Sequence, residues 1–121
     1  MTEGETSRFI RSSFGSIWSL ELLLVLRARP DQSWSHDEVI AALRASEEVL
    51  ARSTSDLRAA GLIATDSAGI RYAPASPERE EMVGVVANLY ATRPAAVRRL
   101  IVGTSDAAAR FADAFLFRKG D

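Results

Sequence analysis

Residues 34–63, WSHDEVIAALRASEEVLARSTSDLRAAGLI, decide the fold of this chain. Ser35 and Glu38 form the S-x-x-E pattern of a capping box, in which each side chain accepts a hydrogen bond from the other residue's amide. A helix is therefore expected from Ser35 to about Arg44. Ala45 and Ser46 leave room only for a tight turn. Ser46 is expected to cap a second helix, which begins with acidic residues at its positive end.

This second helix is expected over residues 47–60, and Gly61 ends it because glycine adopts the left-handed conformation that most residues avoid. Its apolar residues recur at helical spacing and are expected to face the core. They are Val49, Leu50 and Leu57. Two short apolar segments around a glycine-containing turn then predict a β-hairpin over residues 62–73.

Upstream of this stretch, residues 17–29 predict a helix that is apolar on most of its surface and ends at Pro30. Such a helix usually lies at the centre of its domain. Trp34 is expected in a very short strand. Residues 1–15 are expected to form a loose N-terminal arm with three side chains able to dock on the core. These are Phe9, Ile10 and Phe14.

Downstream, Ser76-Pro77-Glu78 predicts a helix start, with a cap, a proline at the first helical position and an acid in the first turn. Arg93-Pro94 is expected to break this helix. A further short helix should end at Gly103, and a last helix should begin at Ser105 or Asp106.

The expected fold class is mainly α with a small β-hairpin (α+β), in 121 residues of which 47% are hydrophobic. We expect an arm over 1–15, a domain over 16–74 and a helical extension over 75–121 that serves packing or dimerisation. The absence of cysteine excludes disulfides and thiolate metal sites. The longest apolar run, Leu22–Leu26, is too short to span a bilayer, and Met1–Ser7 does not resemble a signal peptide. A cytoplasmic protein without membrane contact is expected.

The order helix, short strand, helix, tight turn, helix, hairpin resembles a winged helix-turn-helix domain over residues 16–74. Residues 34–43, 50–57 and 57–63 carry this resemblance. A helix that ends in L-x-x-A-G-L-I before a hairpin is similar to the recognition helix and wing of MarR-, ArsR- and PadR-type bacterial regulators. Residues 90–119 also resemble the tail of short bacterial winged-helix proteins.

The resemblance implies a DNA-binding transcriptional regulator, with residues 47–60 in the major groove and residues 62–73 as a wing. It implies a homodimer that binds double-stranded DNA, and the surplus of apolar residues in the C-terminal helices also favours a homodimer. No cofactor is expected. The candidate DNA contacts are Glu48, Arg52, Ser55, Arg58 and Arg71. Glu48 can accept from a cytosine amine, and the arginines can contact bases or phosphates.

The charge of the sequence is unfavourable for DNA binding. Residues 17–74 carry six basic and eight acidic side chains, and the whole chain has a net charge of −1. DNA affinity comes largely from phosphate neutralisation, so this balance is unfavourable. Arg52 can simply pair with Glu48 or Asp56 on the helix surface. The alternative function is an interaction module or adaptor that binds a regulatory protein and no DNA.

Catalysis and metal binding are not expected. His36 is the only histidine, and the adjacent acids Asp37 and Glu38 do not share its helix face, so no metal site can be assembled. Neither a nucleophile triad nor a glycine-rich phosphate loop is present. The aromatic residues, including Trp18 and Trp34, fit a core better than a ligand pocket, although a small-molecule pocket stays an alternative.

Overall fold

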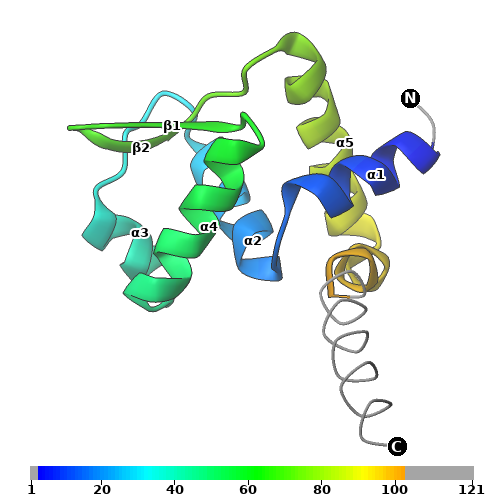
Figure 1. The fold of residues 1–121 in the computed structure, drawn as a ribbon, viewed down its shortest axis with the longest axis horizontal. Helices are drawn as coiled ribbons and strands as arrows, with labels where there is room; N and C mark the ends of the chain where they lie inside the picture. The colour runs from blue at the N-terminus through cyan, green and yellow to red at the C-terminus, as the bar shows by residue number, and fades with distance from the viewer. Residues whose placement is uncertain (1–2, 103–121) are drawn as a thin grey trace, which may run out of the picture.

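The computed structural model describes residues 3–102, and they form a mainly helical chain with one two-stranded antiparallel sheet (Figure 1). The expected α+β class is thereby confirmed. In chain order the elements are α1 (Glu3–Ser13), α2 (Ile17–Ala28), α3 (His36–Leu43), α4 (Glu47–Ala59), β1 (Ile63–Asp66), β2 (Gly69–Tyr72) and α5 (Pro77–Thr92). Residues 94–102 form a further helical stretch up to the last described residue.

The N-terminal arm is a helix, α1, for most of its length, so the expectation of a loose segment is wrong. Ile10 is fully buried and Phe14 is 2% exposed. Phe9 packs edge-on against Phe14, with ring centroids 6.0 Å apart. Helix α1 contacts both α5 and α4. Burial of these apolar side chains offsets the conformational entropy that is lost when a chain terminus becomes ordered.

Helix α2 lies at the centre of the core, as its apolar sequence predicts. Four of its leucines are fully buried, namely Leu20, Leu22, Leu23 and Leu26. It contacts α3, α4 and β2. Its first turn is capped by Ser16, whose side chain accepts a hydrogen bond from the Ser19 amide.

Among residues 3–102, no single helix is long and apolar enough to cross a membrane. Helices α1 and α2 together meet the length and composition required, but the chain bends by 98° between them.

The capping box expected at the start of α3 is present. The Glu38 amide donates to Ser35 Oγ at 3.1 Å, and the Ser35 amide donates to Glu38 Oε1 at 2.8 Å. This backbone donor holds the pKa of Glu38 below its ordinary value. Arg44 then ends α3 in the left-handed conformation, with φ of 55°. The chain turns sharply there and reaches Ser46, which caps α4.

Helix α4 ends in a Schellman motif built on Gly61. The Leu62 amide donates to the Leu57 carbonyl at 3.1 Å, and the Gly61 amide donates to the Arg58 carbonyl at 3.0 Å. Gly61 has φ of +73°, which residues with a Cβ adopt at a cost. The expected end of this helix is confirmed to within one residue, and Leu62 is fully buried beneath it.

The hairpin pairs Ile63 with Tyr72 and Asp66 with Gly69. Trp34 extends this sheet through two hydrogen bonds with Ile70, at 2.7 and 2.9 Å, which confirms the expected short strand. A Cβ at Gly69 would lie 2.0 Å from the Trp34 carbonyl oxygen, so only glycine allows the two backbones to approach this closely.

Helix α5 begins as expected, with Ser76 as its cap and Pro77 at its first position. It ends at Thr92, and residues 94–102 bury Val97 and Ile101 against the rest of the core. The expectations for Gly103, Ser105 and Asp106, and for the helix that follows them, lie outside the described residues.

Candidate functional site

All five candidate DNA-contacting residues are exposed. Four of them lie on α4, and the fifth lies on β2. They are Glu48, Arg52, Ser55, Arg58 and Arg71. Figure 1 shows α4 beside the hairpin, and α4 contacts β1 of the hairpin as well as α2, α3 and α1.

The buried stripe of α4 differs in part from the sequence expectation. Leu50 and Leu57 face the core as expected, but the residue that lies between them is Ser53, which is 2% exposed. Val49 is only partly buried at the edge of this stripe. A small side chain in the middle allows α4 to lie close to α2, its most extensive neighbour.

Arg52 forms an ion pair with Glu48. Its Nη2 lies 3.2 Å from Glu48 Oε1, one helical turn earlier. The two side chains are 75% and 81% exposed, so solvent screens the pair, which therefore contributes little to stability. Both groups remain accessible to a partner, and Asp56, the other acid expected near Arg52, takes no part in the pair.

Asp56 points away from the exposed face and toward α2. Its Oδ2 accepts a hydrogen bond from Ser19 Oγ at 3.0 Å. A Cβ added to Gly15 would lie 2.6 Å from the same oxygen, so the loop before α2 fits closely against this carboxylate. The negative charge also lies beside the first turn of α2, where the helix dipole is positive. The exposed face of α4 is thus less acidic than the sequence of the helix indicates.

The acid of the hairpin is also engaged locally. Asp66 Oδ1 accepts a hydrogen bond from the Ala68 amide at 2.8 Å and so stabilises the turn. Arg71 lies opposite Ala64 in the register and is exposed. Within residues 3–102, neither Arg58 nor Arg71 forms an ion pair.

His36 lies at the start of α3, with Nε2 4.0 Å from Glu47 Oε1 at the start of α4. Both side chains are largely exposed. In the described part of the chain, no group of three or more histidine, cysteine, aspartate or glutamate residues could hold a metal ion.

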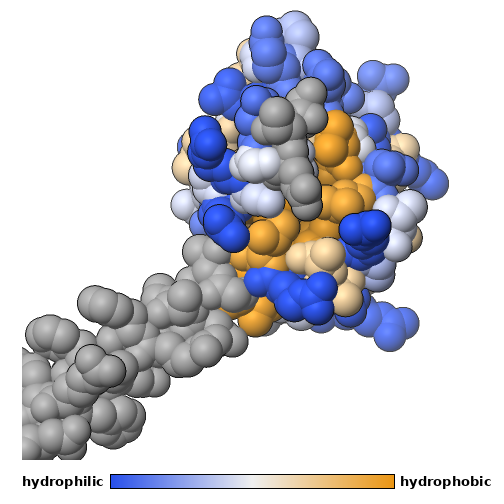
Figure 2. Space-filling view, turned by 90° about the vertical axis from the view of Figure 1, so that its right-hand side faces the viewer, coloured by the Kyte–Doolittle hydropathy of each residue, from blue (hydrophilic) through white to orange (hydrophobic). Residues whose placement is uncertain are grey.

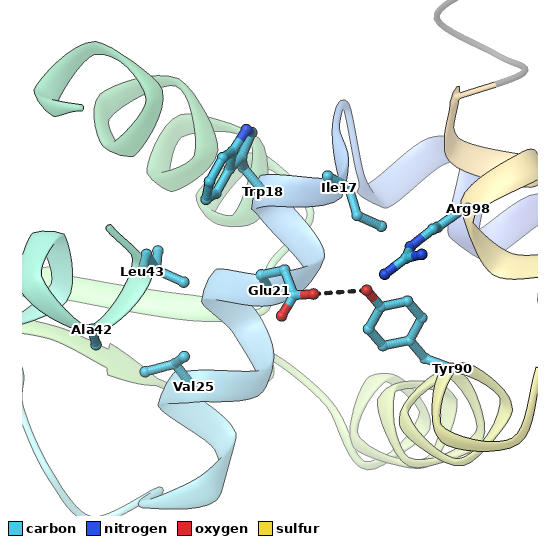
Figure 3. Close-up of a pocket in the computed structure, with 8 residues that line it drawn as sticks. All are labelled: Ile17, Trp18, Glu21, Val25, Ala42, Leu43, Tyr90 and Arg98. Carbon is cyan, nitrogen blue, oxygen red and sulfur yellow. Dashed lines mark hydrogen bonds between the residues drawn. The ribbon is translucent and has the colours of Figure 1, made fainter. Parts of the chain in front are cut away.

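A pocket of about 420 Å³ opens on the side of α2 that faces α3 and α5 (Figure 3). Its apolar wall comes from three α2 residues and from the end of α3. They are Ile17, Trp18, Val25, Ala42 and Leu43. Trp18 is 37% exposed, whereas Trp34 packs against the core and takes no part in the pocket.

Three polar side chains complete this pocket. The Tyr90 hydroxyl donates to Glu21 Oε1 at 2.7 Å, and the Arg98 guanidinium carbon lies 5.9 Å from the centre of the Tyr90 ring. Burial and the hydrogen bond to Glu21 raise the pKa of Tyr90 above its ordinary value. Sequence analysis missed this group. The available signal was Glu21, the only charged residue in the apolar stretch from Ile17 to Leu26.

Comparison with known proteins found no similar protein or structure. No protein-family model matches the chain, and no curated protein or solved structure matches it.

Proposed function

We propose that this chain is a winged helix-turn-helix protein that binds double-stranded DNA, with α4 as the recognition helix and the hairpin as the wing. Support comes from the order of the elements. Helix α2, the Trp34 bridge, α3, a short turn, α4 and the hairpin follow one another as they do in that class of domain. The cap at the N-terminus of α4 and its Schellman end stabilise the helix, which contacts β1 of the hairpin.

The single observation that carries the proposal is the inward direction of Asp56. Its hydrogen bond with Ser19 leaves Ser55 and Arg58 exposed without this acid on their face. Arg71 adds a second exposed cation, from the hairpin. A helix face and a wing that each present an exposed guanidinium can contact two phosphates of one groove.

The biological role that fits this module is transcriptional regulation without catalysis, in the manner of the bacterial regulators that the sequence resembles. Such regulators bind as two-fold dimers to paired half-sites. An apolar surface is available for self-association. Val102, the last described residue, is 46% exposed, and Figure 2 shows apolar side chains gathered on the face that forms the right-hand side of Figure 1.

Fluorescence anisotropy of a labelled mixed-sequence DNA duplex, titrated with the full chain at about 50 and 150 mM salt, tests the proposal. We expect micromolar affinity that falls steeply with salt, because phosphate contacts release counterions. Absence of binding at the lower salt concentration contradicts DNA recognition by α4 and the hairpin.

A second candidate function, recognition of a regulatory protein, is favoured by one observation. Glu47 and Glu48 lie at the first turn of α4 with side chains 83% and 81% exposed, where they would meet the DNA backbone. Two results together favour this second function. They are DNA binding that is weak and insensitive to salt, and loss of binding to a protein partner on Glu47→Lys substitution. DNA binding that strengthens on Glu47→Lys favours the first.

A further inference from the structure

The pocket beside α2 is separate from the exposed face of α4, and its chemistry leads to an inference that is independent of DNA binding. Its volume of about 420 Å³ lies in the range of small-molecule sites. Figure 3 shows Trp18, Val25 and Leu43 on one side and Tyr90 and Arg98 on the other, with Glu21 between them. The pocket is therefore divided into an apolar half and a polar half.

The apolar half offers surface that the fold itself does not cover. Trp18 is a large hydrophobic side chain left 37% exposed on a helix that has four fully buried leucines. Leu43 is partly buried against the core at the end of α3. An aliphatic or aromatic group between these two side chains would remove apolar surface from water, which is favourable. A flat ring also stacks well on an indole.

The polar half has unused hydrogen-bonding capacity of both kinds. The Glu21 carboxylate accepts one hydrogen bond from Tyr90, although a carboxylate has about four lone-pair sites. Arg98 rests on the Tyr90 ring and forms no ion pair within residues 3–102. Its planar guanidinium has donors that suit a carboxylate. One accepting anion and one donating cation thus lie on either side of the same tyrosine.

This charge pair selects the ligand. A purely anionic ligand would be attracted by Arg98 but repelled by Glu21. A purely cationic ligand would be attracted by Glu21 but repelled by Arg98. A head that carries an ammonium next to a carboxylate satisfies both groups at once. We propose that this pocket binds a zwitterionic α-amino acid with an apolar or aromatic side chain, the ammonium on Glu21, the carboxylate on Arg98 and the side chain against Trp18 and Leu43.

Trp18 fluorescence, excited at 295 nm, gives a direct measurement in the full chain carrying Trp34→Phe. Trp34 Nε1 is buried without a hydrogen-bond partner, so this background substitution removes no hydrogen bond. Three probes share one phenyl group and differ only in the head: L-phenylalanine, phenethylamine and 3-phenylpropionate. None of them absorbs at 295 nm. We expect L-phenylalanine to bind at least tenfold more tightly than either singly charged probe.

Substitutions separate the roles of the two charges. Glu21→Gln removes the repulsion of an anion, so 3-phenylpropionate should bind as tightly as L-phenylalanine or more tightly. Arg98→Ala should remove the preference for L-phenylalanine over phenethylamine. Arg99→Ala, an exposed arginine that does not line the pocket, is the matched control and should leave all three affinities unchanged.

Two results overturn the proposal. One is the absence of any change in Trp18 fluorescence with L-phenylalanine up to its solubility limit. The other is equal affinity for the three probes, because the pocket would then recognise only the phenyl group.

Discussion

Ser19 Oγ on α2 donates a hydrogen bond to Asp56 Oδ2 on α4 at 3.0 Å, across 37 positions of sequence. Ser19 is fully buried and Asp56 is partly buried. The bond joins the central helix to the candidate recognition helix and sets which side of α4 carries the acid. Asp56 adds a negative charge to the sequence of α4, which is unfavourable for DNA binding, but in the fold its carboxylate forms a contact with α2.

Asp56→Ala should lower the free energy of unfolding by about 1–2 kcal/mol, since it leaves the buried Ser19 hydroxyl without its charged acceptor. Urea denaturation measures the change. Glu48→Ala on the exposed face of the same helix is the control and should stay within about 0.5 kcal/mol of the parent. A coupling energy of zero between Asp56→Ala and Ser19→Ala in a double-mutant cycle would show that the bond is not formed in solution.

Two glycines should respond in opposite directions to alanine. Gly69→Ala places a Cβ 2.0 Å from the Trp34 carbonyl oxygen at φ of +130°, so we expect a loss of more than about 2 kcal/mol. Gly84→Ala inside α5 meets only Arg27 at an ordinary 3.6 Å and should raise stability by about 0.5–1 kcal/mol. Thermal or urea unfolding of both variants checks this. Equal effects would contradict the close contact between Trp34 and the hairpin.

The protein should lose stability in alkali. Burial and the hydrogen bond to Glu80, at 2.5 Å, raise the pKa of Tyr72 above its ordinary value of 10.0. The folded state therefore holds this proton more tightly than the unfolded state does. The resulting stabilisation is complete below pH 10.0 and is lost as the pH rises through the folded pKa.

Urea unfolding at pH 8 and at several values above pH 10 measures this effect. Tyr72→Phe should reduce the loss of unfolding free energy per pH unit above pH 10. Tyr90→Phe should reduce this loss as well, because the pKa of Tyr90 is also raised. These are the only two tyrosines in the chain, so any loss of stability in alkali that the double variant keeps comes from groups other than tyrosine. The idea fails if the double variant keeps the full loss of the parent.

Removal of the Arg58 and Arg71 guanidinium groups should weaken DNA binding. Arg58→Ala combined with Arg71→Ala should lower affinity about tenfold or more and reduce the dependence of log affinity on log salt by about 2. Arg8→Ala is the control and should bind like the parent, because Arg8 is exposed on α1, a separate element from α4 and the hairpin. Unchanged binding in the double variant means that DNA contacts another surface.

Self-association should depend on the apolar surface near the end of the described chain. We expect a dimer in sedimentation velocity, and Val102→Asp should weaken it at least tenfold because a charge would replace an exposed apolar group. Asp substitution of an exposed polar residue, Asn88→Asp, is the control and should leave the dimer intact. A parent chain that sediments as a monomer at all concentrations rejects the dimer.

The sequence alone determined the features that depend on neighbouring residues. The capping box of Ser35 and Glu38, the caps at Ser46 and Ser76, and the helix end at Gly61 were all predictable. Each rests on hydrogen bonds or backbone preferences that span at most six residues. Such contacts form whenever the chain becomes locally helical, so the pattern of residue types is enough to find them.

Tertiary structure decided the features that depend on how the helices pack. Asp56 turns inward because Leu50, Ser53 and Leu57 set the rotation of α4 against α2. The polar end of the pocket joins Glu21 to Tyr90 across 69 positions of sequence. Helix α1 is ordered because Ile10 and Phe14 are buried by distant elements. Periodicity identifies an apolar face, but the partner of that face, and the side chains that meet at its edges, follow only from three-dimensional packing.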